Sequence, residues 1–384
     1  MVSWQRDRVS CNKAAVAILL RNYQNSKDME CLSHTLTHPG EHFRLEHLHK
    51  FRQDVCALMR ASYLIAQHWF NIIKQEFRQP GNTRWWALYE LYVIFCKYWN
   101  DVYVCISTAV MDGDVGEVGA RINRLVAMMT DCTIRAELRL EIAFVVIVAK
   151  PLVQATYNLE GDGPCSLIAY DQLMICKNWF EAHFEELTFP ELQEEIELAV
   201  EVLSPLKFRN NDVLARESIR QKVKDAIQPA WDYFRTKIFN DLAKDVAIYK
   251  TLRLCNPFSM KRMNFRPNLV EARIGIESLE HFTRDNINQM FNEFPSYLIL
   301  CEQFTANNPE TIEEELRLII KFWRLNKIQL PYLSLFVRYA YCITPSSASV
   351  ERVFSLLKNS FGPQQNLTLE DYIKTSLMFQ YNNR

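Results

Sequence analysis

The sequence has 384 residues, of which 49% are hydrophobic, so the chain is long enough to bury a large core in more than one domain. With only 9 glycines and 14 prolines it lacks the frequent turn residues of an all-β protein, and its net charge of -1 excludes a global attraction to nucleic acid. The eleven cysteines are scattered without any C-x-x-C pair, which argues against a disulfide framework and a classical zinc finger.

Charge is distributed unevenly along the chain. Residues 1–86 carry 12 Lys/Arg against 7 Asp/Glu, whereas residues 155–204 carry one Lys against 11 acids. Phosphate is repelled by an acidic stretch, so nucleic acid is expected elsewhere, and a solvated helix face is the alternative interpretation of the acids. The longest apolar run, residues 142–149, is far short of the roughly 20 residues that cross a bilayer, so we expect a soluble intracellular protein without a membrane partner.

The first 80 residues alternate between short apolar runs and helical patterns. Residues 1–5 fit the end of a buried strand, and apolar residues at helical spacing predict a helix over 12–23, which places Asp7 on a strand-to-helix turn. A second apolar run, 29–36, leads through a His-rich segment into a helix that ends near Phe77. The break at Gln79-Pro-Gly-Asn closes this part of the chain.

The region up to residue 326 offers many amphipathic faces and almost no alternation of period two, which favours one large helical domain. Pro151 is expected to kink or break the helix that contains it, Pro229 is expected to bend its helix, and Thr311-x-x-Glu314 is a capping box. The expected helices cover about residues 83–99, 114–131, 133–158, 166–187, 190–203, 212–252, 268–281, 286–304 and 311–326.

The strongest motif is near the C-terminus, where small residues are followed by Glu351-Arg352-Val353-Phe354-Ser355. A helix here places Val350, Val353, Phe354 and Leu357 on one face, and a final helix that begins after Thr368 places Ile373 and Leu377 on its apolar side. Two short amphipathic helices cannot bury these side chains by themselves. They must pack on the rest of the chain or on a second copy.

This motif resembles the C-terminal dimerisation region of hAT-family DNA transposases. Three upstream segments also resemble the family in the right order, namely Arg6-Asp7-Arg8, Cys31-x-x-His34 and Arg84-Trp85. The resemblance implies a mainly α fold in which a truncated ribonuclease-H-like α/β core is interrupted by a large all-helical insertion domain. The implied parts are a core remnant over 1–80, the insertion over 81–326, and a dimerisation region over 327–384 that completes the core.

By the same resemblance, Asp7 and Glu351 are the second and third of three carboxylates that hold two divalent metal ions, Mg²⁺ or Mn²⁺, for phosphodiester cleavage. The first carboxylate has no counterpart, because only six residues precede Asp7 and none is acidic. The sequence also lacks the family's N-terminal zinc finger for DNA. We therefore expect no cofactor and no competent transposase in this chain as it stands, and we expect homodimerisation, or a higher self-assembly, to be its retained activity.

Two other functions stay open. The chain could be a fragment of an active transposase that carries out two-metal DNA cleavage and strand transfer, or a non-catalytic nucleic-acid-binding module that uses the basic excess of residues 1–86. A nuclear location follows from the family resemblance alone, since no long Lys/Arg run is present.

Each motif residue also has a structural interpretation. Arg84 and Trp85 resemble family residues at the DNA, where an aromatic ring stacks on a flipped base, but a core aromatic cluster around Trp85 is equally compatible with the sequence. Asp7 could simply favour a helix dipole, and Glu351-Arg352 could be an ion pair. The residues expected to support dimerisation are Ser347, Arg352, Val353, Phe354, Ser355, Leu357, Ile373 and Leu377.

The His-rich segment offers a further alternative. Thiolate and imidazole ligands at spacings of three and four suit zinc, but Pro39-Gly40 interrupts the helix that such spacing requires, and the resemblance gives Cys31 and His34 a packing role. The zinc hypothesis would draw its ligands from Cys31, His34, His38, His42, His47 and His49.

Overall fold

The computed structural model describes residues 3–6, 10–22, 26–61, 63–81, 85–111, 119–186, 190–305, 307–348 and 351–352. In this part of the chain the protein is mainly helical, as expected, with 17 α-helices and two short strands. It forms two compact units, unit 1 from residues 1–35, 155–174 and 238–384, and unit 2 from residues 36–154 and 175–237. The ribonuclease-H-like core and the three-part division at residues 80 and 326 stay predictions.

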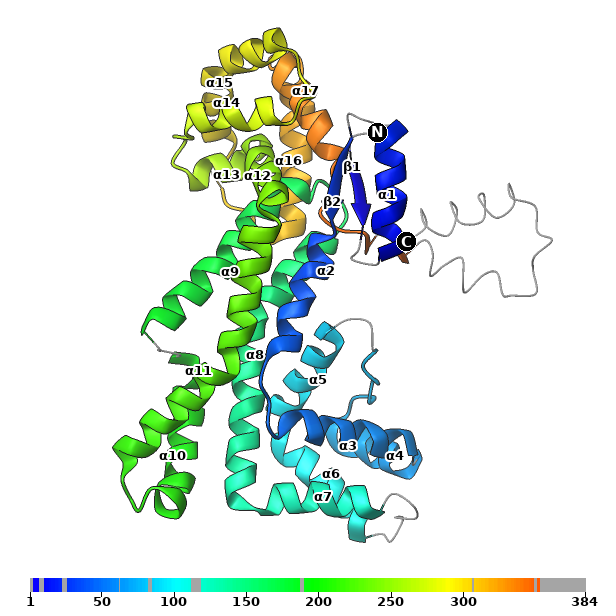
Figure 1. Cartoon of the computed structure of the whole chain (residues 1–384), viewed down its shortest axis with the longest axis vertical. Coiled ribbons are helices and arrows are strands. Elements are labelled where there is room, and N and C mark those ends of the chain that lie inside the picture. Colours follow the sequence, from blue (N-terminus) through cyan, green and yellow to red (C-terminus); the bar gives the residue numbers. More distant parts are fainter. Residues whose placement is uncertain are drawn as a thin grey trace, which may run out of the picture. The chain divides into compact units, whose positions relative to one another are not determined.

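Unit 1 contains a βαβ element near the N-terminus (Figure 1). Strand β1 (Ser3–Arg6) pairs in parallel with β2 (Lys27–Glu30), and α1 (Ser10–Asn22) connects them. Parallel strands require such a crossover because a tight turn cannot join them. The strand at residues 1–5 and the helix at 12–23 were predicted from the sequence, whereas β2 was not.

The remaining helices of unit 1 pack around a cluster of buried aromatic rings. Tyr297 stacks on Trp323 with ring centroids 5.4 Å apart, and both polar tips are satisfied by the backbone. Tyr297 donates to the carbonyl of Leu254 and Trp323 Nε1 to that of Cys255, each at 2.7 Å. The helices are α2 (Leu32–Thr37), α12 (Ala243–Leu252), α13 (Pro257–Arg262), α14 (Leu269–Ser278), α15 (Arg284–Phe304), α16 (Ile312–Asn326) and α17 (Pro331–Tyr341).

Helix α16 begins where the sequence predicts. Thr311 Oγ1 accepts from the backbone N–H of Glu314, and Glu314 Oε2 in turn accepts from the N–H of Glu310. Two donors that an unfinished helix end would leave without partners are thereby satisfied.

A buried polar network joins α13 and α16 in unit 1. The carboxylate of Glu315 accepts from Asn256 Nδ2 at 2.8 Å and from Arg262 at 2.9 Å, and Arg262 also reaches Asp171 at 2.7 Å. Asn256 and Glu315 are almost fully buried, so these bonds compensate the cost of removing charge from water. The network fixes the α16 position from its inner side.

Unit 2 is all-helical among its described residues. Helix α6 was not predicted from the sequence, and α8 is not broken at Pro151. Helix α11 continues past Pro229, in agreement with the predicted range, to a π-helical turn at Lys237–Asp241 that was not predicted. A kink at Pro151 and a bend at Pro229 stay predictions. The helices, of which α8 and α9 also extend into unit 1, are η1 (His38–His42), α3 (Leu48–Ala61), α4 (Tyr63–Ile73), α5 (Trp85–Lys97), α6 (Trp99–Met111), α7 (Gly119–Thr130), α8 (Cys132–Glu160), α9 (Ser166–Glu186), η3 (Pro190–Leu192), α10 (Gln193–Lys207) and α11 (Asp212–Thr236).

None of the helices in the described ranges has both the length and the apolar composition that a membrane-spanning segment needs.

Candidate functional site

Two sequence motifs more than 300 residues apart meet in unit 1. The backbone N–H of Leu32 donates to the carbonyl of Pro345 at 2.8 Å, and Ser33 Oγ donates to Ser346 Oγ at 2.8 Å. All four residues are buried, so each bond replaces a hydrogen bond with water. Loss of either bond would therefore lower the stability of the folded state. The start of α2 and the loop after α17 therefore form one contact.

The thiol of Cys31 is at the centre of this contact. Its Sγ accepts from the backbone N–H of Ser347 at 3.3 Å and lies 3.3 Å from the hydroxyl oxygens of both Ser347 and Ser33. Cys31 is only 2% exposed, so it behaves as a small buried group with polar neighbours. These contacts support the packing role that the resemblance gives to Cys31, which directly precedes α2, and His34 is half-buried on that helix.

Ser347 links the thiol to the acid of the C-terminal motif. Its Oγ lies 2.7 Å from Glu351 Oε1, and a helical turn joins the two residues because the N–H of Glu351 donates to the carbonyl of Ser347 at 3.0 Å. A hydroxyl has one proton, and the shorter, charge-assisted bond to the carboxylate is the stronger of its two alternatives. Ser347 thus positions the Glu351 carboxylate relative to the Cys31 segment.

Arg352 ties the same motif to the C-terminal end of α8. One guanidinium nitrogen donates to the carbonyl of Glu160 at 3.1 Å, and another donates to Asp162 Oδ1 at 3.0 Å. A cation at a helix C-terminus satisfies a carbonyl that has no partner within the helix and is favoured by the dipole. Asp162 is 92% exposed, so the carbonyl contact contributes more to the position of Arg352 than the ion pair does.

Several predicted site residues lie outside the described residues. Of the predicted metal pair, Glu351 is described and Asp7 is not, so a metal site formed by the two stays a prediction. The other predicted residues outside the described ranges are Arg84, Val353, Phe354, Ser355, Leu357, Ile373 and Leu377.

Trp85 of unit 2 packs in an aromatic cluster. Its ring covers Gly40 so closely that a Cβ added there would lie 2.0 Å from it. The ring centroid is 5.6 Å from that of Phe43 and 6.3 Å from those of Tyr89 and Tyr92. These contacts favour the core interpretation of Trp85, and its DNA contact stays a prediction.

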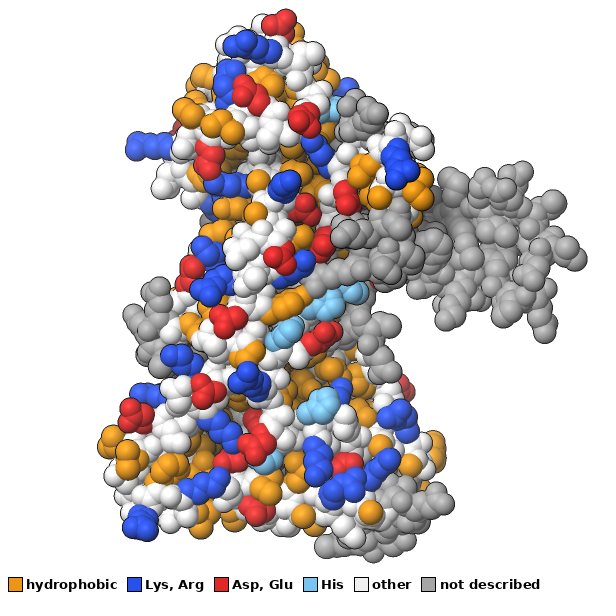
Figure 2. Space-filling model, in the orientation of Figure 1, with side chains coloured by type: hydrophobic (Ala, Val, Ile, Leu, Met, Phe, Trp, Pro, Cys, Tyr) orange, Lys and Arg blue, Asp and Glu red, His pale blue; other side chains and the backbone are white. Residues whose placement is uncertain are grey.

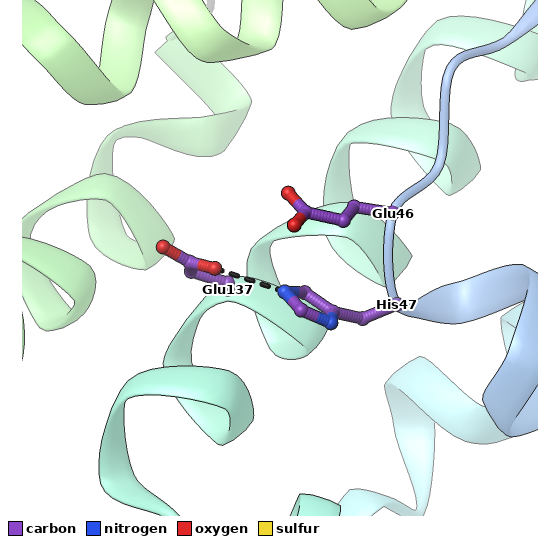
Figure 3. Close-up of side chains that lie close together, drawn as sticks. All are labelled: Glu46, His47 and Glu137. Atoms are coloured by element: carbon purple, nitrogen blue, oxygen red, sulfur yellow. Dashed lines mark hydrogen bonds and ion pairs between the residues drawn. The ribbon is translucent and has the colours of Figure 1, made fainter.

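Among the described residues, one group has three potential metal-ligating side chains close together, namely Glu46, His47 and Glu137 (Figure 3). His47 Nε2 is 2.9 Å from Glu137 Oε2, but Lys222 Nζ lies 3.1 Å from the same carboxylate and 3.3 Å from Glu46. Lys207 Nζ contacts the other Glu137 oxygen at 2.7 Å. The Lys222 ammonium already occupies the position that a bound cation would take, so these side chains form an ion-pair network with Lys222 and Lys207. Of the six residues in the zinc hypothesis, this network contains only His47.

These cations set the ionisation of Glu137. Burial alone would raise the pKa of its carboxyl, but hydrogen bonds from Lys207, His47 and Lys222 lower it to about 2. One turn further along α8, Glu141 accepts from the N–H groups of Glu46, His47 and Leu48 at the start of α3, and burial raises its pKa. Sequence patterns missed both acids because their partners lie about 70 to 95 residues away.

A basic groove runs between α3 and α7 of unit 2. A cavity of about 660 Å³ is lined by Arg60, Arg121 and Arg124, and Figure 2 shows Lys and Arg side chains gathered over α3. Arg124 is already held by Asp54 through two bonds of 2.7 and 3.0 Å, which leaves Arg60 and Arg121 as the exposed cations of the groove. Such a groove suits an anionic ligand.

One comparison with known proteins identifies part of the chain. Residues 302–383 match the hAT family C-terminal dimerisation region, and this match includes α16, α17 and the Ser347 to Arg352 segment. No curated protein matches the chain.

Proposed function

We propose that the chain is a protein related to hAT transposases and that it self-associates through its C-terminal region. The observation that carries the proposal is the family match over residues 302–383, a region described as one for dimerisation. Within the described part of this region, Ser347 and Arg352 are anchored to distant segments of unit 1 by the bonds given above. An anchored scaffold of this kind presents a defined surface to a second copy, which lowers the entropy cost of association.

Sedimentation equilibrium of the full chain at micromolar concentrations tests this function. We expect a concentration-dependent shift from monomer to dimer or to a larger assembly. Phe354→Ser should weaken it because Phe354 is on the apolar face predicted for the motif helix. Lys358→Gln should not, because Lys358 is on the polar face predicted roughly a quarter-turn away. A monomer at all concentrations would contradict self-association, and circular dichroism would identify a variant that has lost its fold.

The catalytic alternative is two-metal cleavage and strand transfer in which Asp7 and Glu351 ligate Mg²⁺ or Mn²⁺. Its distinctive result is strand transfer of a hairpin-ended DNA with either ion, abolished by Glu351→Gln. Self-association should be unchanged in that variant, so the two functions are separable in one preparation. DNA chemistry that depends on Glu351 would identify an enzyme.

A second candidate is binding of nucleic acid in the basic groove of α3 and α7. The exposed Arg60 and Arg121 at the 660 Å³ cavity favour it. Because phosphate contacts release counterions, affinity for an oligonucleotide should fall steeply with salt. Arg60→Gln with Arg121→Gln should reduce that salt dependence, and unchanged binding would remove the groove from consideration.

The family resemblance also favours a nuclear location for the chain. Imaging of the tagged chain in cells tests this location.

A further inference from the structure

Helix α16 has a buried face and an outer face of a different kind. Leu316, Ile319, Phe322 and Trp323 are buried. On the other side, Arg317, Lys321 and Arg324 follow one another at spacings of four and three and continue to Ile328 in the turn after the helix, so they form one exposed stripe. The whole stripe lies inside the matched dimerisation region.

Two aliphatic side chains project from this face. Leu325 is 66% exposed and Ile328 is 86% exposed, a value that no other large hydrophobic residue reaches in the described ranges. Leu325 lies in the last turn of α16, and Ile328 follows three residues later in the turn after the helix. Such a pair on an otherwise charged face favours an interaction site.

The cations around this pair form no ion pairs with acids of their own helix. Arg317, Lys321, Arg324 and Lys327 lie in a stretch, 316–329, that contains no Asp or Glu, and the nearest accessible acids of α16 are the exposed Glu313 and the half-buried Glu314, one turn before Arg317. None of the four cations forms an ion pair with another residue that the structure describes. Two such faces would repel each other, so an acidic surface is the favourable partner for this part of α16.

The chain itself carries an acidic surface with matching features. On α10, Glu194 and Glu201 are exposed, seven residues apart and therefore on one side of the helix, with the half-buried Leu198 between them. Neither acid has an ion-pair partner among the described residues. Beside this helix, within unit 2, lies a cavity of about 240 Å³, whose lining includes Trp99, Tyr103, Met129, Leu198, Glu201 and Val202.

We propose that the outer face of α16 docks on the α10 surface of a second copy, with Ile328 and Leu325 entering the cavity and the α16 cations facing Glu194 and Glu201. The inference rests on the proposed self-association and names its surfaces. The cavity also contains Arg135 and Arg139, of which Arg139 is paired with Glu195 at 3.2 Å. Because the two surfaces differ, the contact builds a closed assembly or an open chain of copies according to the rotation between neighbouring copies.

Charge reversal and rescue test the docking. The dissociation constant of the full chain is measured by sedimentation at low and high salt. Lys321→Glu with Arg324→Glu should raise it about tenfold, and Glu194→Lys with Glu201→Lys should do the same. The protein with all four changes should return to within about threefold of the unchanged chain, because the ion pairs are restored with reversed sign. Salt should weaken the unchanged assembly.

The control pair is Lys244→Glu with Arg266→Glu, which makes the same charge change at exposed positions outside the matched region and should leave the constant unaltered. A monomeric unchanged chain would contradict the proposed function itself. Self-association that tolerates the Lys321 and Arg324 changes, or a loss that the acidic changes do not rescue, would overturn only the docking of α16 on α10. Reversal that impairs oligonucleotide binding and leaves self-association intact would instead identify a polyanion as the occupant.

Discussion

Single hydroxyl groups carry the contact between the two ends of unit 1. Ser33 Oγ and Ser346 Oγ form a buried hydrogen bond of 2.8 Å. Ser33→Ala takes this bond away from Ser346 Oγ, and alanine offers no polar group to replace it. We expect a loss of about 1–2 kcal/mol in the free energy of unfolding, measured by urea denaturation. Ser278→Ala, at an exposed hydroxyl, is the control and should change it by less than about 0.5 kcal/mol.

A single carboxylate should also give unit 2 a dependence on pH. The folded-state pKa of Glu137 is lowered to about 2 from an ordinary value of 4.5, so its contribution to stability is complete above pH 4.5 and is lost as the pH falls through 2. Solvent screening limits that contribution to about 2 kcal/mol.

Comparison of the unchanged protein with Glu137→Gln over this range isolates the effect. The difference in unfolding free energy should shrink as acid is added. Glu217→Gln, at an exposed acid of unit 2 without an ion pair in the described residues, should show no such trend. A difference that stays constant with pH would show that the cations around Glu137 do not act on its ionisation.

Among the elements, the packing of η1 against α5 depends on one missing methyl group. A Cβ at Gly40 would lie 2.0 Å from the Trp85 ring, which neighbouring aromatic rings hold in place. Gly40→Ala should therefore destabilise the protein by about 1–3 kcal/mol, as overpacking does elsewhere. Gly161→Ala is the matched control, because its nearest neighbour would be 3.5 Å away. Equal thermal stability of the two variants would contradict the packing of Trp85 on Gly40.

The first turn of α16 allows a second test of an element. Thr311→Ala removes the side-chain acceptor for the N–H of Glu314 and should cost about 1 kcal/mol. Thr311→Ser keeps the acceptor and should be nearly neutral. If both variants lose the same stability by thermal unfolding, the methyl group of Thr311 and not its hydroxyl supports the helix.

The same elements show how far the sequence predicts the fold. Capping and turn residues are local signals, so the start of α16 at Thr311 and the break before α5 were predicted correctly. Helix α6 was missed because only Tyr98 separates it from α5, without a Gly or Pro to mark the boundary. The π-helical turn at Lys237–Asp241 was missed for the same reason, because this segment contains no Gly or Pro.

The candidate site was predictable in its parts and not in its assembly. The resemblance singled out Cys31 and Glu351, but the link that Ser347 makes between them depends on a contact across 316 residues. No local pattern encodes such a contact. The network at Glu137 was missed for the same reason, since its Lys partners are 70 and 85 residues distant on other helices.

For the whole molecule, the state of the cysteines gives an expectation that covers both units. All ten cysteines that the structure assigns are free, and only Cys96, Cys132 and Cys342 are exposed. A thiol reagent should therefore modify these three quickly in the native protein and the buried ones only after denaturation. Alanine at the three positions should remove the fast phase of thiol modification, apart from any contribution of Cys11. Because the ten assigned cysteines are free, a reducing agent should leave the thermal stability unchanged.

The bond from Leu32 to Pro345 also has a consequence for the order of events during synthesis on the ribosome. Unit 2 ends at residue 237, so all of its segments have been translated before residues 238–384 appear. Unit 1 cannot close until Pro345 and Ser346 emerge and meet residues made more than 300 positions earlier. The early βαβ element must therefore wait with its apolar surface uncovered. During this interval the nascent chain is most dependent on chaperones.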